Sequence, residues 1–188
     1  MKEVEIQVKV EKLQPLLDLL GKEGEFKGEK HQIDEYFSPA HRDFTAVRPV
    51  SEWLRLRESG GKASVNYKFW NHDEQGKSTY ADEHETSVAD ISVMRKIFEV
   101  LNFKKIAVVD KVRRVWKCGE YEVAVDSVKD LGDFVEVELL TDREVDAPKI
   151  IAEMVDFLKK AGCGKLEKNS VGYPFMLLFK DEVVIEHL

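Results

Sequence analysis

The first residues of the chain alternate strictly between apolar and polar positions. Residues 2–10, KEVEIQVKV, place valine or isoleucine at the even positions from 4 to 10 and charged or amide side chains at every odd one. A period of two predicts a β-strand with one apolar and one polar face. Further strands are predicted over 26–38, 53–58, 63–70, 78–86, 103–117, 121–128 and 134–140.

Three segments have helical spacing of their apolar residues instead, and we expect helices at 12–24, 88–101 and 147–161. Pro15 and Pro148 fit the first turns of two of them, and Asp90 is the expected N-cap of the third. Residues 39–50 are predicted to form a loop. Residues 175–179 are expected to form a final core strand, with a homodimer contact as the alternative. No linker divides the chain, which predicts a single α+β domain over residues 1–188.

Composition narrows the class of protein. Of 188 residues, 43% are hydrophobic and 35% charged, and 29 Lys and Arg against 36 Asp and Glu give a net charge of −7. A net acidic chain argues against a general nucleic-acid binder. No apolar run approaches the length that spans a bilayer, and the N-terminus is charged, so we expect a cytoplasmic protein without a membrane partner.

Four predicted strands carry like charges two residues apart, on one face of each strand. Like charges so close together repel, and a solvated sheet gains by mixing signs across its strands. The pattern is better explained if a cation binds the acidic strands and a polyanion the basic ones, which indicates a metal-dependent site for a phosphate-rich ligand. The acidic pairs are Glu3 with Glu5 and Glu136 with Glu138, and the basic pairs are Arg55 with Arg57 and Lys111 with Arg113.

These segments resemble the CYTH superfamily, the triphosphate tunnel metalloenzymes, which include class IV adenylyl cyclases and thiamine triphosphatases. The family's N-terminal E-x-E-x-K strand is matched by Glu3-Val4-Glu5-Ile6-Gln7, with Gln7 at the lysine position. We expect Lys9, on the same face, to supply the missing charge. The other matches run in family order: DEYF at 34–37, LRLR at 54–57, Lys68, EHE at 83–85, KVRR at 111–114 and LGDFVEVE at 131–138.

The resemblance implies an antiparallel closed β-barrel of about eight strands, a triphosphate tunnel, with helices packed outside. Its acids would hold Mg²⁺ or Mn²⁺, which prefer oxygen ligands. Its bases would hold the phosphates, with Lys111 and Arg113 also acting in catalysis. The implied metal ligands are Glu3, Glu5, Glu85, Asp126, Glu136 and Glu138, and the implied substrate-binding residues are Lys9, Arg55, Arg57, Lys68, Lys111 and Arg113.

Three functions remain open on the sequence. The first is a class IV adenylyl cyclase-like enzyme that converts ATP to cyclic AMP and pyrophosphate, because the Leu-Gly-Asp-Phe segment resembles that branch. The second is a triphosphatase acting on thiamine triphosphate, inorganic triphosphate or a nucleoside triphosphate. The third is a non-catalytic polyphosphate- or nucleotide-binding protein, which the neutral Gln7 favours.

Overall fold

The structure of the protein is a computed structural model that describes residues 2–72 and 78–188, except for the side chains of residues 2, 3, 72 and 78–80. The chain forms two compact units. The first unit comprises Met1–Lys30, Lys111–Gly172 and Asp181–Leu188, and the second comprises His31–Asp110 and Tyr173–Lys180. Two long strands, β2 (Glu25–Ser38) and β6 (Lys104–Cys118), contribute residues to both.

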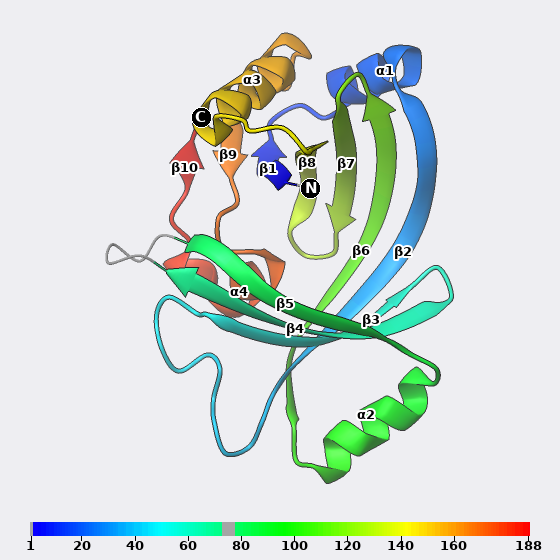
Figure 1. Cartoon of the computed structure of the whole chain (residues 1–188), viewed down its shortest axis with the longest axis vertical. Helices are drawn as coiled ribbons and strands as arrows, with labels where there is room; N and C mark the ends of the chain where they lie inside the picture. Colours follow the sequence, from blue (N-terminus) through cyan, green and yellow to red (C-terminus); the bar gives the residue numbers. More distant parts are fainter. Residues whose placement is uncertain (1, 73–77) are drawn as a thin grey trace. The chain divides into compact units, whose positions relative to one another are not determined.

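The first unit is an antiparallel sheet with two helices (Figure 1). Its strand order is β10–β9–β1–β8–β7–β6, and β1 pairs along almost its whole length with β8. The helices are α1 (Gln14–Glu23) and α3 (Ala147–Lys160). The strands are β1 (Lys2–Val10), β7 (Tyr121–Val128), β8 (Gly132–Thr141), β9 (Leu166–Lys168) and β10 (Glu186–His187).

The core of the first unit lies between the apolar sheet face and these helices. Val8, Leu16 and Leu20 pack there with Met154 and Leu158, and all five side chains are fully buried. Each such side chain contributes roughly 1.5–3 kcal/mol relative to exposure. The even positions of β1 thus face the core, and the odd positions lie on the opposite face of the sheet.

The second unit continues from β2 through β3 (Glu52–Ser59) and β4 (Lys62–His72) to β5 (Ser78–Val88), all antiparallel. Helix α2 (Ile91–Val100) covers its apolar face through Phe98, which packs with Phe37 and Leu56. The Asp90 side chain caps this helix by accepting hydrogen bonds from the backbone N–H groups of Ser92 and Val93. Between β9 and β10 lie two short helical segments, α4 (Tyr173–Leu178) and the 3₁₀ turn Lys180–Glu182.

Most predicted elements are confirmed, including the three helices with their capping Asp90 and their first-turn prolines. The predicted core strand at 175–179 is wrong, because this segment forms helix α4. Phe175 and Phe179 lie one helical turn apart, 5.0 Å between ring centroids, and the Arg48 guanidinium lies 3.9 Å from the Phe179 ring centroid. These contacts favour a helix over an extended strand.

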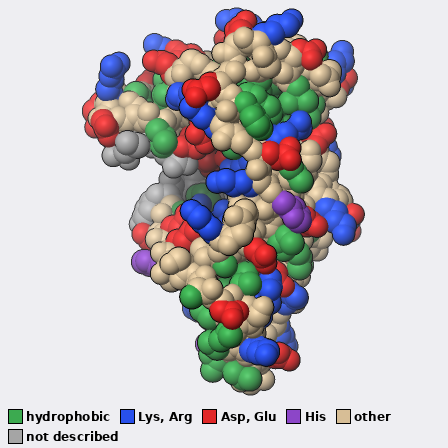
Figure 2. Space-filling model, turned by 90° about the vertical axis from the view of Figure 1, so that its right-hand side faces the viewer, with side chains coloured by type: hydrophobic (Ala, Val, Ile, Leu, Met, Phe, Trp, Pro, Cys, Tyr) green, Lys and Arg blue, Asp and Glu red, His purple; other side chains and the backbone are tan. Residues whose placement is uncertain are grey.

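The α+β class with a large antiparallel sheet is confirmed. The sheet has ten strands instead of about eight, and the hydrogen-bonded order of the described strands ends at β10 and at β5. Closure into a barrel therefore stays a prediction. Within the described residues, none of the helices combines the length and the apolar character that crossing a membrane requires. Acidic and basic side chains are interspersed over the surface seen in Figure 2, as the high charged content leads one to expect.

Candidate functional site

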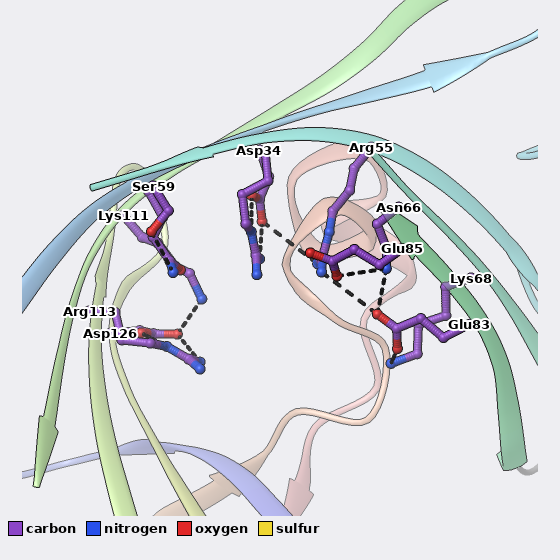
Figure 3. Close-up of polar contacts among 12 residues, drawn as sticks. Asp34, Arg55, Ser59, Asn66, Lys68, Glu83, Glu85, Lys111, Arg113 and Asp126 are labelled. Carbon is purple, nitrogen blue, oxygen red and sulfur yellow. Dashed lines mark hydrogen bonds and ion pairs between the residues drawn. The ribbon is translucent and has the colours of Figure 1, made fainter. Parts of the chain in front are cut away.

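The charged face of the first unit carries a buried ion-pair cluster around Asp126. Strand β7 places Asp126 directly opposite Arg113 of β6. The Arg113 guanidinium donates from Nε to Asp126 Oδ1 at 2.7 Å and from Nη2 to Oδ2 at 2.8 Å. Lys111 donates from Nζ to the same Oδ2 at 2.7 Å. Figure 3 shows the three side chains together.

Burial makes this cluster electrostatically strong. The side chains of Lys111 and Asp126 are only 5% and 2% exposed. Burial raises the pKa of the Asp126 carboxyl, but the hydrogen bonds and charges of Arg113 and Lys111 outweigh it and hold this pKa below its ordinary value. Burial, followed by repulsion from Arg113, lowers the pKa of Lys111. The Asp126 carboxylate thus offsets the repulsion between two cations that both donate to it.

Glu136 of β8 extends the cluster toward β1. Its Oε2 atom accepts from Arg113 Nη2 at 3.0 Å and from Gln7 Nε2 at 2.8 Å. Gln7 lies directly opposite Glu136 in the register of β1 and β8. The Gln7 Oε1 atom in turn accepts from Asn169 Nδ2 at 2.5 Å. An uninterrupted hydrogen-bonded chain therefore joins Asn169 to Arg113.

Lys9 follows Gln7 on the same face of β1 and points to the turn before β8. Its Nζ donates to the backbone carbonyl of Leu131 at 3.0 Å and lies 5.8 Å from the Phe134 ring centroid. Its side chain is exposed. The contacts place the Lys9 charge at the turn before β8, whereas Gln7 occupies the position beside Glu136.

A row of acids crosses the same sheet face. Glu5 lies opposite Glu138, which lies opposite Glu122. Directly opposite residues have Cβ atoms about 4.5–5.5 Å apart, and like charges there are destabilising. Among the described side chains, no three metal-ligating groups converge on one point. Glu3 belongs to β1 by its backbone, opposite Leu140, but its side chain lies outside the described residues.

The second unit has its own cluster, centred on the buried Asp34 of β2. Arg57 donates to both Asp34 carboxylate oxygens, from Nε and from Nη2, each at 2.6 Å. Arg55 lies farther away, with Nη1 3.8 Å from Asp34 Oδ2. The Arg55 Nε atom is buried and has no hydrogen-bond partner among the described residues. Asp34 therefore fixes Arg57 firmly and holds Arg55 through charge alone.

The cluster continues across β4 and β5 (Figure 3). Lys68 forms an ion pair with Glu83, Nζ to Oε2 at 3.3 Å, and its Nζ lies 4.5 Å from the Trp70 ring centroid. Asn66 donates from Nδ2 to Glu83 Oε1 at 2.6 Å and to Glu85 Oε2 at 3.1 Å. Burial opposes ionisation of Glu83, but the Lys68 charge and the Asn66 hydrogen bond hold its pKa below the ordinary value.

Each unit thus brings together part of the predicted set. The first unit joins Lys111, Arg113, Asp126 and Glu136 by direct hydrogen bonds, and the second links Arg55, Arg57, Lys68 and Glu85 through Asp34, Asn66 and Glu83. Their metal- and substrate-binding roles stay predictions.

The sequence prediction did not assign roles to four other polar residues of these faces. Residues an even number of positions apart share one face of a strand, so Glu122 shares a face of β7 with Asp126, and Asn66 shares a face of β4 with Lys68. This rule could have added Glu122 and Asn66 to the predicted set. Gln7 and Asn169 could not be paired by any local pattern, because 162 positions separate them.

Comparison with known proteins bears on this arrangement. The CYTH domain family model matches residues 1–173. A Methanocaldococcus jannaschii protein is 34% identical over 166 residues, which cover 88% of this chain and 92% of the relative.

Two solved structures share the fold. A Pyrococcus horikoshii protein has a TM-score of 0.72 at 24% identity, covering 96% of this chain and all of that one. A Hippeastrum protein has a TM-score of 0.65 at 19% identity, covering 97% of each chain. The family match spans the β1 acidic strand, the two cation clusters and the β8 acids. The chain therefore belongs to the CYTH domain family.

Proposed function

We propose that the protein is a metal-dependent enzyme acting on a triphosphate, with conversion of ATP to cyclic AMP and pyrophosphate as its first candidate reaction. The observation that carries the proposal is the pairing of Lys111 and Arg113 with the buried Asp126 and the partly buried Glu136 on one sheet face. Family membership supports a triphosphate ligand. The M. jannaschii relative is named "Putative adenylate cyclase", which supports the cyclase reaction.

Buried ion pairs of this kind are a poor device for stability. Removing two charges from water costs more than their attraction returns, unless the geometry is excellent. A phosphate group offers several charged oxygens to the same donors, and the arginine fork matches two of them at once. We infer that Lys111 and Arg113, and Arg55 and Arg57 in their own unit, exchange carboxylate partners for phosphate oxygens when the substrate binds.

The acidic side chains fit a divalent cation by their donor chemistry. Mg²⁺ and Mn²⁺ prefer oxygen ligands, and Mg²⁺ usually binds through one or two carboxylates together with substrate phosphates and water. Glu5, Glu138 and Glu122 lie opposite one another in register and offer carboxylate oxygens of this kind. Glu136 lies beside this row, and its Oε1 accepts no hydrogen bond from any described residue. When bound, the cation would lower the energy of the negative charge that develops on the phosphates.

The chain's own residues would bind and orient the substrate. In the cyclase reaction a ribose 3′-oxygen forms a bond to the α-phosphorus, the bond from that phosphorus to the pyrophosphate oxygen breaks, and the hydroxyl proton leaves. Such a transfer requires chiefly positioning and charge stabilisation. The guanidinium groups would supply both, because one carboxylate orients each of Arg57 and Arg113 through two hydrogen bonds before the substrate binds.

Hydrolysis of the terminal phosphate is the second candidate. The same contacts would serve it, with water attacking the terminal phosphorus in place of the ribose oxygen. The Hippeastrum protein of the same fold is described as a putative adenylyl cyclase with a dominant triphosphatase activity. Inorganic triphosphate and thiamine triphosphate are substrates to test under this alternative.

Product analysis separates the candidates. The protein is incubated with ATP, tripolyphosphate or thiamine triphosphate, each with Mg²⁺ or Mn²⁺, and cyclic AMP, pyrophosphate and orthophosphate are resolved. Cyclic AMP with an equal amount of pyrophosphate supports the cyclase, and orthophosphate supports the hydrolase. Heat protection by ATP or tripolyphosphate without turnover would refute both enzymes and indicate a binding protein.

A further inference from the structure

Gln7 has a fixed orientation, and three successive contacts determine it. The backbone N–H groups of Val171 and Gly172 donate to Asn169 Oδ1 at 3.3 and 3.0 Å. The Asn169 side-chain nitrogen must therefore point elsewhere, and it donates to Gln7 Oε1 at 2.5 Å. The Gln7 nitrogen is left to face Glu136. Backbone donors thus set the direction of both amides.

This chain of contacts ends on a single oxygen of Glu136. Oε2 accepts from Gln7 at 2.8 Å and from Arg113 at 3.0 Å, and the side chain is 14% exposed. Among the described residues, nothing donates to Oε1. Because Oε2 already accepts two hydrogen bonds, Glu136 can offer only Oε1 to a cation. The arrangement therefore favours a cation that Glu136 binds through one oxygen.

We propose that Gln7, aligned by Asn169, is a positioning residue that presents Glu136 Oε1 to the divalent cation. This inference rests on the proposed function. A neutral amide holds the carboxylate without adding a positive charge beside it, so Glu136 attracts the cation with its charge undiminished by Gln7. Partners of this kind outside the metal's own ligands typically change metal affinity 10–100-fold.

Two substitutions remove the alignment in different ways. Gln7→Met keeps the length of the side chain and removes its hydrogen bonds. Asn169→Asp still accepts from the two backbone N–H groups, so the turn is retained, but it offers Gln7 only acceptor oxygens. The Gln7 amide then gains a hydrogen bond by turning its nitrogen toward residue 169. Its oxygen then faces Glu136 and repels that carboxylate.

Gln14→Met is the matched control. Gln14 of α1 also donates from Nε2 to a carboxylate oxygen at 2.8 Å, that of Asp18, but on an exposed helix surface. Mn²⁺ affinity is measured by calorimetry and by the electron paramagnetic resonance signal of free Mn²⁺, without and with tripolyphosphate. We expect Gln7→Met and Asn169→Asp each to weaken Mn²⁺ binding about tenfold or more, and Gln14→Met to leave it unchanged.

Gln7→Lys should change the affinities for Mn²⁺ and for tripolyphosphate in opposite directions. A lysine beside Glu136 competes with the cation, so Mn²⁺ binding without polyphosphate should weaken about tenfold, while tripolyphosphate binding without metal should tighten. A merely structural role for Gln7 would lower the unfolding temperature and move neither affinity in this opposed way.

The outcomes separate this inference from the proposed function. If Gln7→Met and Asn169→Asp bind Mn²⁺ like the wild type while metal-dependent turnover is observed, the inference is refuted and the function stands. If both variants lose Mn²⁺ affinity but the wild type turns over no triphosphate, the positioning role stands and the enzyme assignment fails. A wild type that binds no Mn²⁺ under either condition overturns both.

Discussion

Asp126→Asn tests most directly whether the cations that Asp126 now neutralises, Lys111 and Arg113, bind phosphate. Asp126 is 1% exposed and accepts three hydrogen bonds from Lys111 and Arg113, at 2.7–2.8 Å. Asparagine keeps the shape of the side chain but removes its charge and turns a donor toward two cations. Lys111, with a side chain 5% exposed, then loses the carboxylate to which it donates.

The expected loss of stability follows from these contacts. Removing one partner of a buried ion pair costs about 3–5 kcal/mol, because the other charge stays buried without compensation. We expect the lower part of this range, because Arg113 retains Glu136 as a partner. Urea unfolding should therefore show a decrease of about 3 kcal/mol in the free energy of unfolding.

Ligand binding should change in the opposite direction. Without metal, tripolyphosphate should bind Asp126→Asn at least about tenfold more tightly than the wild type, because one negative charge has left the cluster. Titration calorimetry measures this, and Asp18→Asn, at an exposed position of α1, serves as the control. A stability loss below about 1 kcal/mol, or weaker tripolyphosphate binding by a folded variant, would refute the reasoning.

Three further variants test other parts of the structure. Glu136→Gln should remove most metal-dependent turnover, and unchanged rates at saturating Mg²⁺ would exclude a metal role. Arg57→Ala should weaken binding of triphosphate far more than that of monophosphate in parallel titrations, whereas equal losses would make Arg57 structural. Burial opposes ionisation of Glu35, but hydrogen bonds from Lys105 and Arg95 hold its pKa below 4.5. Around and below pH 4.5, Glu35 therefore binds more protons in the unfolded chain than in the folded one, and the free energy of unfolding falls as the pH decreases. Glu35→Gln removes this contribution, so the free energy of unfolding from urea titrations should depend less on pH between about pH 5 and 3.

The sequence predicts those elements whose causes are local. Strand β1 follows from strict alternation over residues 3–10, and α3 from helical spacing with Pro148 in the first turn. Helix α4 could not be predicted in this way. The ring of Phe175 packs with that of Phe179, which follows the helix, and both lie against Arg48 from a distant loop.

The same distinction holds for the candidate site. Period two assigns Arg113 and Asp126 each to the polar face of its strand, and charge favours their pairing. The partner of Gln7 depends on the register between β1 and β8, and its orientation depends on the turn after β9. The sequence therefore shows that Gln7 departs from the family pattern. Its contacts in the cluster can be seen only in the structure.

The charges of the cluster in the first unit lead to one further expectation. In the first unit, Lys111 and Arg113 face Asp126 and Glu136, so two positive charges meet two negative ones, and the neighbouring acid row adds negative charge. Gln7 contributes none. A triphosphate carries several negative charges, so added cations should strengthen its binding to a cluster without excess positive charge.

Metal and polyphosphate should consequently bind cooperatively. Because the coupling free energy is reciprocal, Mn²⁺ must raise the affinity for tripolyphosphate by the same factor by which tripolyphosphate raises the affinity for Mn²⁺. Two linked calorimetric titrations measure the two factors. If tripolyphosphate binds equally well with and without Mn²⁺, the carboxylates of the cluster do not hold the cation at the phosphate site, and a neutral Gln7 would then need another explanation.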